Sequence, residues 1–258
     1  DISGHYAAGI GRIDDFQVNP NNTNEIYASS RSGGLWKTTN EGETWTATAT
    51  ETLKASGVDA IAVDPLNFNH VFITVQNAIN NYSYGIYESF DGGASFAETR
   101  FNPQNLNLGG LGSNFRIYSL VSHPTQKNIL FAGTSRGMYK TIDNFNTWTK
   151  VINGGQIIQI ETHPTQANVV YAYSNSNRNT LFRSSNTGSS FSTTTINGNN
   201  NNSAKIGLTN NAPNDVYIAS AAGIFRSTNS GQSFSFVSNQ LSGIDGVNTD
   251  VFCVNSNN

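Results

Sequence analysis

The chain has 258 residues, a net charge of −3 and no run of one charge sign, which argues against a nucleic-acid partner or an anionic membrane partner. Charged residues make up only 12% of the sequence, about half the share of an average globular domain. No apolar run approaches the ~18 residues of a membrane span, and the single cysteine, Cys253, excludes an intrachain disulfide and a cysteine zinc site.

From the first residues onward, short alternating runs of Val, Ile, Tyr and Phe are separated by Asn, Gly and Pro, which predicts β-strands. In each of five units, one run ends near a proline, a second follows a polar turn, a third enters a Ser/Thr-rich turn and a fourth leaves it. The units cover about 9–50, 57–101, 115–152, 156–197 and 204–238. Four strands per unit at this spacing predict an all-β fold, a β-propeller with four-stranded antiparallel blades.

The run at 246–258, "GVNTDVFCVNSNN", follows the fifth unit. It predicts either the first strand of a sixth blade, in a fragment of a longer chain, or a strand that closes the ring by pairing with blade one. Because the first unit already has four strands, a fragment with five blades and the start of a sixth is favoured.

A nine-residue turn joins the third and fourth strands of every unit, at 37–45, 88–96, 140–148, 183–191 and 226–234. Its fourth residue should accept hydrogen bonds from turn N–H groups, and its sixth, usually glycine, should adopt a positive φ. Since three copies have asparagine in place of aspartate, an architectural role is favoured over a metal or acid site. Phe145 replaces the glycine in the third turn, so an altered turn is expected at 144–146, with Asp143 still capping. The capping residues are Asn40, Asp91, Asp143, Asn186 and Asn229, and the closing aromatics are Trp45, Phe96, Trp148, Phe191 and Phe234.

These turns and the opening "GIGRID…NPNNTNEIYASSRSGGLWKTTNEGETW" resemble the Asp-box, or BNR, repeats of sialidases, sortilin-type propellers and xyloglucanase-like enzymes. The whole chain is similar to the Asp-box propellers of secreted Bacteroidetes proteins, many of which are exported with a type IX sorting tail. The resemblance implies a secreted or bacterial cell-surface location.

Resemblance to sialidases implies an Arg-Ile-Pro motif and a Tyr–Glu pair, but "GRID" (11–14) and "FRIY" (115–118) lack the proline and no such pair can be assigned. Resemblance to xyloglucanases implies a catalytic aspartate before the Gly-Gly pair of the first blade, where this chain has Arg31. Glycoside hydrolysis generally needs two carboxylates, so we expect binding rather than catalysis, with no catalytic residue assigned. The remaining stray carboxylates are Asp14, Asp15, Asp59 and Asp64.

The histidines form no metal set, and neither a metal nor a cofactor is expected. His123 and His163 occupy equivalent His-Pro positions and are interpreted as turn residues, whereas His5 and His70 stand alone.

The loops opposite the repeated turns are the irregular ones, above all 76–85 and 98–114. Residues eight positions before each strand-one proline should ring the mouth of the central channel; these are Arg12, Gly57, Arg116, Gln156 and, approximately, Lys205. Candidates around them are Arg31, Tyr82, Tyr84, Arg100, Phe101, Arg136 and Arg178.

Aromatic faces and planar hydrogen-bonding groups suit a glycan or peptide. The sequence thus predicts an adhesion or ligand-binding module for a polysaccharide or protein ligand. The alternatives are a glycoside hydrolase whose acids lie outside the segment and a structural subunit that binds copies of itself.

Overall fold

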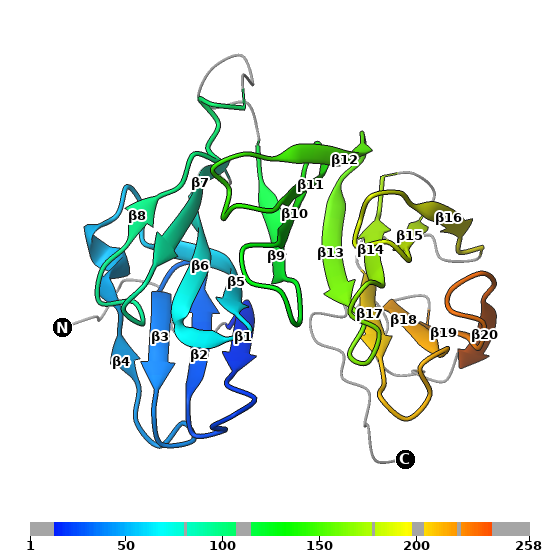
Figure 1. The fold of residues 1–258 in the computed structure, drawn as a ribbon, viewed down its shortest axis with the longest axis horizontal. Helices are drawn as coiled ribbons and strands as arrows, with labels where there is room; N and C mark the ends of the chain where they lie inside the picture. The colour runs from blue at the N-terminus through cyan, green and yellow to red at the C-terminus, as the bar shows by residue number, and fades with distance from the viewer. Residues whose placement is uncertain are drawn as a thin grey trace. The chain divides into compact units, whose positions relative to one another are not determined.

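The computed structural model describes residues 13–79, 82–106, 115–176, 179–197, 204–220 and 223–238. Within these residues, twenty strands form five four-stranded sheets, blades 1 to 5 (Figure 1). Each sheet takes its strands in chain order. The expected all-β class, a propeller with four-stranded antiparallel blades, is confirmed. The run at 246–258, with Cys253, and His5 lie outside the described residues.

The strands are short, and the connections between them are mostly turns. Blades 1 and 2 contain β1 (Asp15–Val18), β2 (Ile26–Ser30), β3 (Gly34–Thr38), β4 (Thr46–Ala47), β5 (Gly57–Asp64), β6 (Asn67–Asn77), β7 (Tyr82–Ser89) and β8 (Ala97–Glu98). Blade 3 contains β9 (Ile117–Ser122), β10 (Leu130–Thr134), β11 (Gly137–Thr141) and β12 (Thr149–Asn153). Blades 4 and 5 contain β13 (Ile157–Thr162), β14 (Val170–Ser174), β15 (Thr180–Ser184), β16 (Ser192–Thr195), β17 (Ala204–Leu208), β18 (Val216–Ser220), β19 (Gly223–Ser227) and β20 (Ser235–Ser238). One 3₁₀ turn, η1 (Ala49–Thr52), follows β4.

The hydrophobic cores lie between neighbouring blades. The chain divides into two units, residues 1–132 with 140–149 and residues 133–139 with 150–258. In the first unit, Tyr27 and Leu35 of blade 1 pack against Ile61, Ile73 and Tyr87 of blade 2. In the second unit, an equivalent core joins blades 4 and 5. Each fully buried side chain of this size contributes about 1.5–3 kcal/mol, so face-to-face packing of blades holds each unit together.

The five nine-residue turns, which we call the box turns, share one hydrogen-bond scheme. In the second, the Ser89 hydroxyl accepts a bond from Gly93 N at 2.8 Å and donates one to Asp91 Oδ1 at 2.8 Å. The hydroxyl of Ser95 donates to Asp91 Oδ2 at 2.6 Å, and this bond leads the interactions that lower the pKa of Asp91 to about 2. Both oxygens of the Asp91 carboxylate therefore accept hydrogen bonds from residues of the same turn and stabilise it.

Asparagine fulfils the same role without charge. In the first box turn, Asn40 Oδ1 accepts a bond from Thr44 N at 3.0 Å, while Asn40 Nδ2 donates to Thr44 Oγ1 at 3.0 Å. The bond to the hydroxyl is kept with its direction reversed, which explains why aspartate is optional in these turns.

The expected alteration of the third box turn is wrong. Asn144 and Phe145 adopt φ of 58° and 60°, and Phe145 N donates to Thr141 Oγ1 at 2.9 Å as the glycine does elsewhere. Phe145 is fully buried, with its ring 4.9 Å from that of Phe101. Packing of this ring offsets the ~1–2 kcal/mol cost of a left-handed non-glycine residue. Asp143 caps the turn, accepting a bond from Thr147 N at 2.8 Å.

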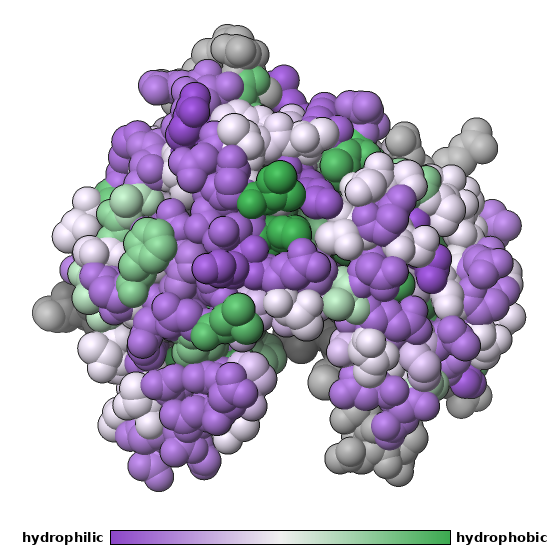
Figure 2. All heavy atoms as spheres, viewed as in Figure 1, coloured by the Kyte–Doolittle hydropathy of each residue, from purple (hydrophilic) through white to green (hydrophobic). Residues whose placement is uncertain are grey.

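The surface is mainly hydrophilic. In Figure 2, hydrophilic residues cover most of the face in view and hydrophobic ones form small separate patches. None of the described helices has the length and apolar character that crossing a membrane requires.

Candidate functional site

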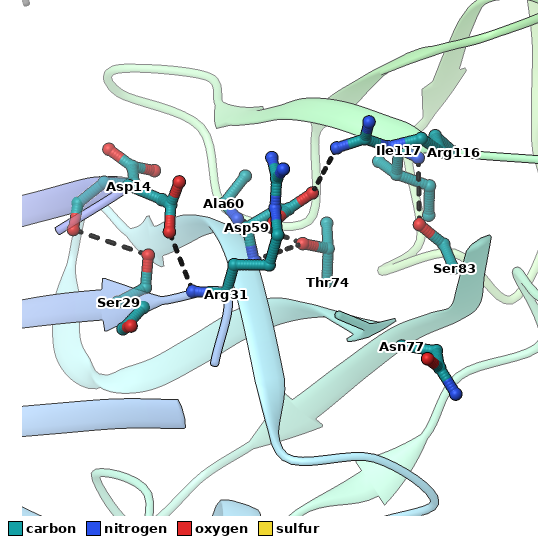
Figure 3. Close-up of polar contacts among 12 residues, drawn as sticks. Asp14, Ser29, Arg31, Asp59, Ala60, Thr74, Asn77, Ser83, Arg116 and Ile117 are labelled. Atoms are coloured by element: carbon teal, nitrogen blue, oxygen red, sulfur yellow. Dashed lines mark hydrogen bonds and ion pairs between the residues drawn. The ribbon is translucent and has the colours of Figure 1, made fainter. Parts of the chain in front are cut away.

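Four charged residues of the first unit form an arginine–aspartate cluster: Asp14, Arg31, Asp59 and Arg116 (Figure 3). Asp14 precedes β1, Arg31 follows β2, Asp59 lies in β5 and Arg116 precedes β9. Three blades therefore supply the cluster, at the strand ends opposite the box turns.

An irregularity in β5 places Asp59. The pairing of β5 with β6 shifts register between Val58 and Ile61. Thr74 Oγ1 accepts bonds from the backbone N–H groups of Asp59 and Ala60, at 3.3 and 3.0 Å. A hydroxyl thus satisfies N–H groups that a regular ladder would pair, as buried backbone requires.

Asp59 binds both arginines with its one carboxylate. Its Oδ1 accepts a bond from Arg31 Nε at 2.8 Å, and its Oδ2 lies 3.2 Å from Arg116 Nη2. The Asp59 side chain is 4% exposed, against 29% for Arg31 and 19% for Arg116. Asp14 Oδ2 accepts a bond from Arg31 N at 2.7 Å, which fixes the backbone of the same arginine. Because both oxygens of Asp59 face guanidinium groups, this carboxylate is poorly placed to transfer protons.

The cluster favours the charged form of Arg31, whose side chain is partly exposed. Burial opposes the charge of Arg31, but the hydrogen bond with Asp59 and the negative charges of Asp59 and Asp14 together outweigh it, so the pKa of Arg31 is raised. Among the described residues, the Arg31 terminal nitrogens have no hydrogen-bond partner, and they remain as donors for a ligand. The Arg116 guanidinium lies 5.0 Å from the ring centre of Tyr118, and burial raises the pKa of that phenol.

Tyr82 and Tyr84 form a second group, on β7. Their hydroxyls lie 2.9 Å apart and their rings meet edge to face at 5.1 Å. The hydrogen bond with Tyr84 is the main cause of a raised pKa at Tyr82. Ser83, between them, accepts a bond from Ile117 N at 3.0 Å and so points to the other side of β7. The tyrosines therefore lie on the face of β7 away from β9.

The other sequence-derived candidates are divided between the two units or lie outside the described residues. Arg100 is exposed. Phe101 is fully buried against Phe145 and Trp148, so its assignment to a ligand surface is wrong. Arg136 and Lys205 belong to the second unit, as does Gln156. Arg12 and Arg178 lie outside the described residues.

Gly57 supports the cluster through its missing side chain. An added Cβ would lie 2.2 Å from the carbonyl oxygen of Arg31 and 2.6 Å from that of Gln76. Real Cβ contacts are longer, so only glycine lets β5 approach the chain at Arg31.

The expectation that His70 stands alone is wrong. Its Nδ1 lies 3.0 Å from Asp64 Oδ2, its Nε2 lies 2.7 Å from Glu88 Oε1, and the ring of Phe90 stacks on it at 4.5 Å. Asp64 also accepts a bond from Leu66 N at 2.9 Å, the turn role expected of it.

His123 and His163 cap turns. Nδ1 of His123 accepts bonds from the backbone N–H groups of Thr125 and Gln126, at 3.2 and 3.1 Å. His163 Nδ1 does the same in blade 4. In both turns the histidine Nδ1 accepts the backbone hydrogen bonds that a carboxylate oxygen of aspartate would accept in a turn of this kind.

Neither metal-ligating residues nor cavities identify a second candidate site among the described residues. Within the described part of the chain, no group of three His, Cys, Asp or Glu residues could hold a metal ion. Two open cavities of about 530 and 470 Å³ lie on the box-turn side of blades 1 and 2. No residue of the arginine–aspartate cluster lines either of them, and the first is walled by Asp91 and its glycines, whose polar groups the turn already uses.

Arg31 and Arg116 were expected near one another at the channel mouth, whereas Asp14 and Asp59 were not connected with them. Asp59 was a stray carboxylate, although an acid inside the apolar run "GVDAIAV" is a signal for a buried ion pair. Its partners lie 28 and 57 positions away, which the sequence pattern does not reveal.

No protein-family model matches the chain. In sequence it is 27% identical over 150 residues to a protein named "Probable oligoxyloglucan-reducing end-specific xyloglucanase" from Neosartorya fischeri, covering 56% of this chain and 18% of that protein. It is also 27% identical over 166 residues to a xyloglucanase of a Paenibacillus species, covering 59% of this chain and 16% of that one. The chain thus spans less than a fifth of the curated relatives it matches.

Solved structures support the fold. A GH74 xyloglucanase from Xanthomonas campestris matches 88% of this chain with a TM-score of 0.65 at 15% identity, over 37% of its own length. An ancestral GH74 enzyme matches 88% with a TM-score of 0.65 at 22% identity, over 31% of its length. The extracellular domain of a one-component system from B. thetaiotaomicron matches 92% with a TM-score of 0.64 at 16% identity, over 29% of its length. The chain therefore has a propeller fold of the xyloglucanase type.

Proposed function

We propose that this chain is a polysaccharide-binding part of a propeller of the glycoside-hydrolase type, and that its arginine–aspartate cluster contacts the glycan. The adhesion role expected from the sequence receives no support from the relatives, whereas the glycoside-hydrolase alternative does. Secretion or cell-surface exposure is part of the proposal, supported by the extracellular domains among the structural neighbours. Export by a type IX tail and membership of the Asp-box family rest on the sequence resemblance alone.

One observation carries the proposal: Asp59 holds two partly exposed arginines and leaves terminal donors of Arg31 unused by the described residues. Planar hydrogen-bond donors that are already fixed in position suit vicinal hydroxyl groups. Because the arginine side chains are ordered before the ligand arrives, less conformational entropy is lost on binding. The pairing of Arg31 and Arg116 with Asp59 and Asp14 balances charge, which favours a neutral polysaccharide over a polyanion.

The cluster binds rather than cleaves in this proposal. Arg31 stands where the xyloglucanase resemblance implies an aspartate, and the arginines engage both oxygens of Asp59. A second candidate function, hydrolysis, is favoured by one feature: two carboxylates, Asp14 and Asp59, flank Arg31 (Figure 3). Retaining and inverting glycosidases both need such a pair.

Affinity electrophoresis through gels that contain xyloglucan, other neutral glucans or a polyuronate tests the binding proposal. We expect retardation in a neutral glucan gel, and loss of most of it in Arg31→Gln. A lost charged hydrogen bond is worth ~1.5–3 kcal/mol, or roughly ten- to hundredfold in Kd. Lys127→Gln, which removes one exposed positive charge from the β9–β10 turn, is the matched control. Equal mobility of wild type and Arg31→Gln in every gel contradicts the proposal.

A reducing-sugar assay on the same polysaccharides separates binding from hydrolysis. We expect no release of reducing ends by this chain. Release that Asp14→Asn abolishes, with binding kept, would instead assign catalysis to the two carboxylates.

A further inference from the structure

The connection between β12 and β13 contains an asparagine followed by two glycines, Asn153, Gly154 and Gly155 (Figure 1). Of the two Asn-Gly pairs in the sequence, this is the one whose residues are both described. Asn153 is the last residue of β12, and both it and Gly154 are exposed. The two glycines adopt φ of 73° and 76°. A Cβ added at Gly154 would meet no heavy atom within 4 Å apart from its chain neighbours, so the space around this peptide group is open.

No hydrogen bond within the described part of the chain holds this peptide group. Neither the side-chain amide of Asn153 nor the backbone N–H of Gly154 has a partner among the described residues. Because Gly154 and Gly155 lack Cβ atoms, rotation of the peptide group between Asn153 and Gly154 meets little steric resistance. The Gly154 nitrogen can therefore approach the side-chain carbonyl carbon of Asn153.

Comparable residues elsewhere are held by their turns. Asp91 also precedes a glycine, but Gly92 N donates to Asn69 O at 2.8 Å, and both Asp91 carboxylate oxygens accept bonds from the box turn. In the box turn of blade 5, Asn229 Oδ1 accepts a bond from Ser233 N at 3.0 Å, and Asn229 Nδ2 donates to Ser233 Oγ at 2.9 Å. A side-chain carbonyl carbon that is held in this way must leave its turn before a backbone nitrogen reaches it.

We propose that Asn153 is a site of spontaneous deamidation in the folded chain. The Gly154 nitrogen loses its proton to hydroxide and attacks the side-chain carbonyl carbon of Asn153. A new C–N bond forms, the side-chain nitrogen takes a proton from water and leaves as ammonia, and a succinimide ring remains. Water then adds to either ring carbonyl and breaks its C–N bond, which gives aspartate or isoaspartate. Water and hydroxide are the only reactants besides the chain, and the reaction does not depend on the proposed glycan binding.

The products change the charge and the main chain at this connection. Either product has a carboxylate where Asn153 has an amide, which adds one negative charge to a chain whose net charge is −3. Isoaspartate also lengthens the main chain by one carbon atom between β12 and β13. Because Asn153 is exposed and β12 is the end strand of its sheet, the modified chain should stay folded and be separable from the original by charge.

Incubation of the folded full chain at pH 8.5, followed by peptide mapping with mass spectrometry, tests the proposal. We expect the Asn153 peptide to be converted with time to the mass of the carboxylate product, and an isoaspartyl methyltransferase to label it. The reaction should be slower at pH 5.5, because the Gly154 nitrogen must lose its proton. Asn153→Gln requires closure of a larger ring, and the Cβ of Gly154→Ala hinders the attack. Each variant should slow the reaction at least about tenfold.

The same incubation in urea gives the rate in the unfolded chain and makes the test decisive. We expect Asn153 in the folded chain to react within about tenfold of its unfolded rate. Folding should slow Asn229 more than Asn153, because the hydrogen bonds of Asn229 must break first. The proposal is overturned if Asn153 stays unmodified in the folded chain, whether or not it reacts in urea, or if folding protects both asparagines equally. Unchanged product formation in Gly154→Ala overturns it as well.

Discussion

His70 ties three strands of blade 2 together, and we expect its removal to cost a large part of the stability of the chain. Asp64 of β5 and Glu88 of β7 hold its two ring nitrogens from opposite sides, at 3.0 and 2.7 Å. The residue is 5% exposed, and Phe90 stacks over its ring. Removing one partner of a buried, hydrogen-bonded ion pair costs about 3–5 kcal/mol. His70→Ala should therefore lower the free energy of unfolding by about that amount.

The same bridge gives a pH dependence whose sign follows from its geometry. Burial opposes the charge of His70, but the hydrogen bonds with Glu88 and Asp64 and the negative charges of these carboxylates together outweigh it, so the pKa of His70 is raised. The folded state therefore binds this proton more tightly than the unfolded state does. The resulting stability is complete below the unfolded pKa of ~6.5 and is lost as pH rises through the folded pKa.

Urea unfolding followed by tryptophan fluorescence measures both effects. The informative quantity is the difference in unfolding free energy between wild type and His70→Gln, because other titrating groups cancel in it. We expect this difference to be larger at pH 5.5 than at pH 8.5, with His70→Ala less stable than His70→Gln at both. A loss below about 1 kcal/mol for His70→Ala at pH 5.5, within the range of ordinary surface changes, would refute the bridge. If the difference in unfolding free energy between wild type and His70→Gln does not change with pH, the proposed protonation of His70 in the bridge is refuted.

Three further outcomes are expected. Phe145→Ala should destabilise the chain by about 3–5 kcal/mol in urea, because it loses the ring contact with Phe101 and keeps the positive φ; wild-type stability would contradict the role of packing. Gly57→Ala should be poorly folded and bind no glycan, because its Cβ would meet two carbonyl oxygens, whereas Gly154→Ala, with nothing within 4 Å, should lose only ~1–2 kcal/mol of conformational energy; equal melting temperatures would contradict this. Gln76→Leu should raise the melting temperature, since neither polar atom of that buried amide has a hydrogen-bond partner among the described residues and an unpaired buried group costs about 1–3 kcal/mol; a clear fall would show that the amide has a partner.

The fold could be predicted because the sequence repeats it. Five copies of one turn fix where the third and fourth strands meet, and alternation of apolar residues fixes which side of each strand is buried. Leu35 and Trp36 illustrate this, since they are neighbours in β3 and lie on opposite sides of blade 1, with Leu35 buried and Trp36 exposed.

The failures have physical causes that lie outside the local pattern. Phe145 occupies a glycine position because Phe101, 44 positions earlier in the sequence, packs against it. His70 looks isolated because its partners come from two other strands. Asp59 looks stray because its arginines come from blade 1 and from the start of blade 3. Each of these interactions depends on contacts between strands that the repeat itself does not encode.

Arg31, held by Asp59, is the residue that we propose binds a neutral polysaccharide. Isothermal titration calorimetry of the chain with xyloglucan oligosaccharides tests it most directly. We expect saturable binding by wild type and Lys127→Gln, and a Kd at least roughly tenfold weaker for Arg31→Gln. Identical isotherms for wild type and Arg31→Gln, or no heat from wild type with any neutral glucan, would contradict it.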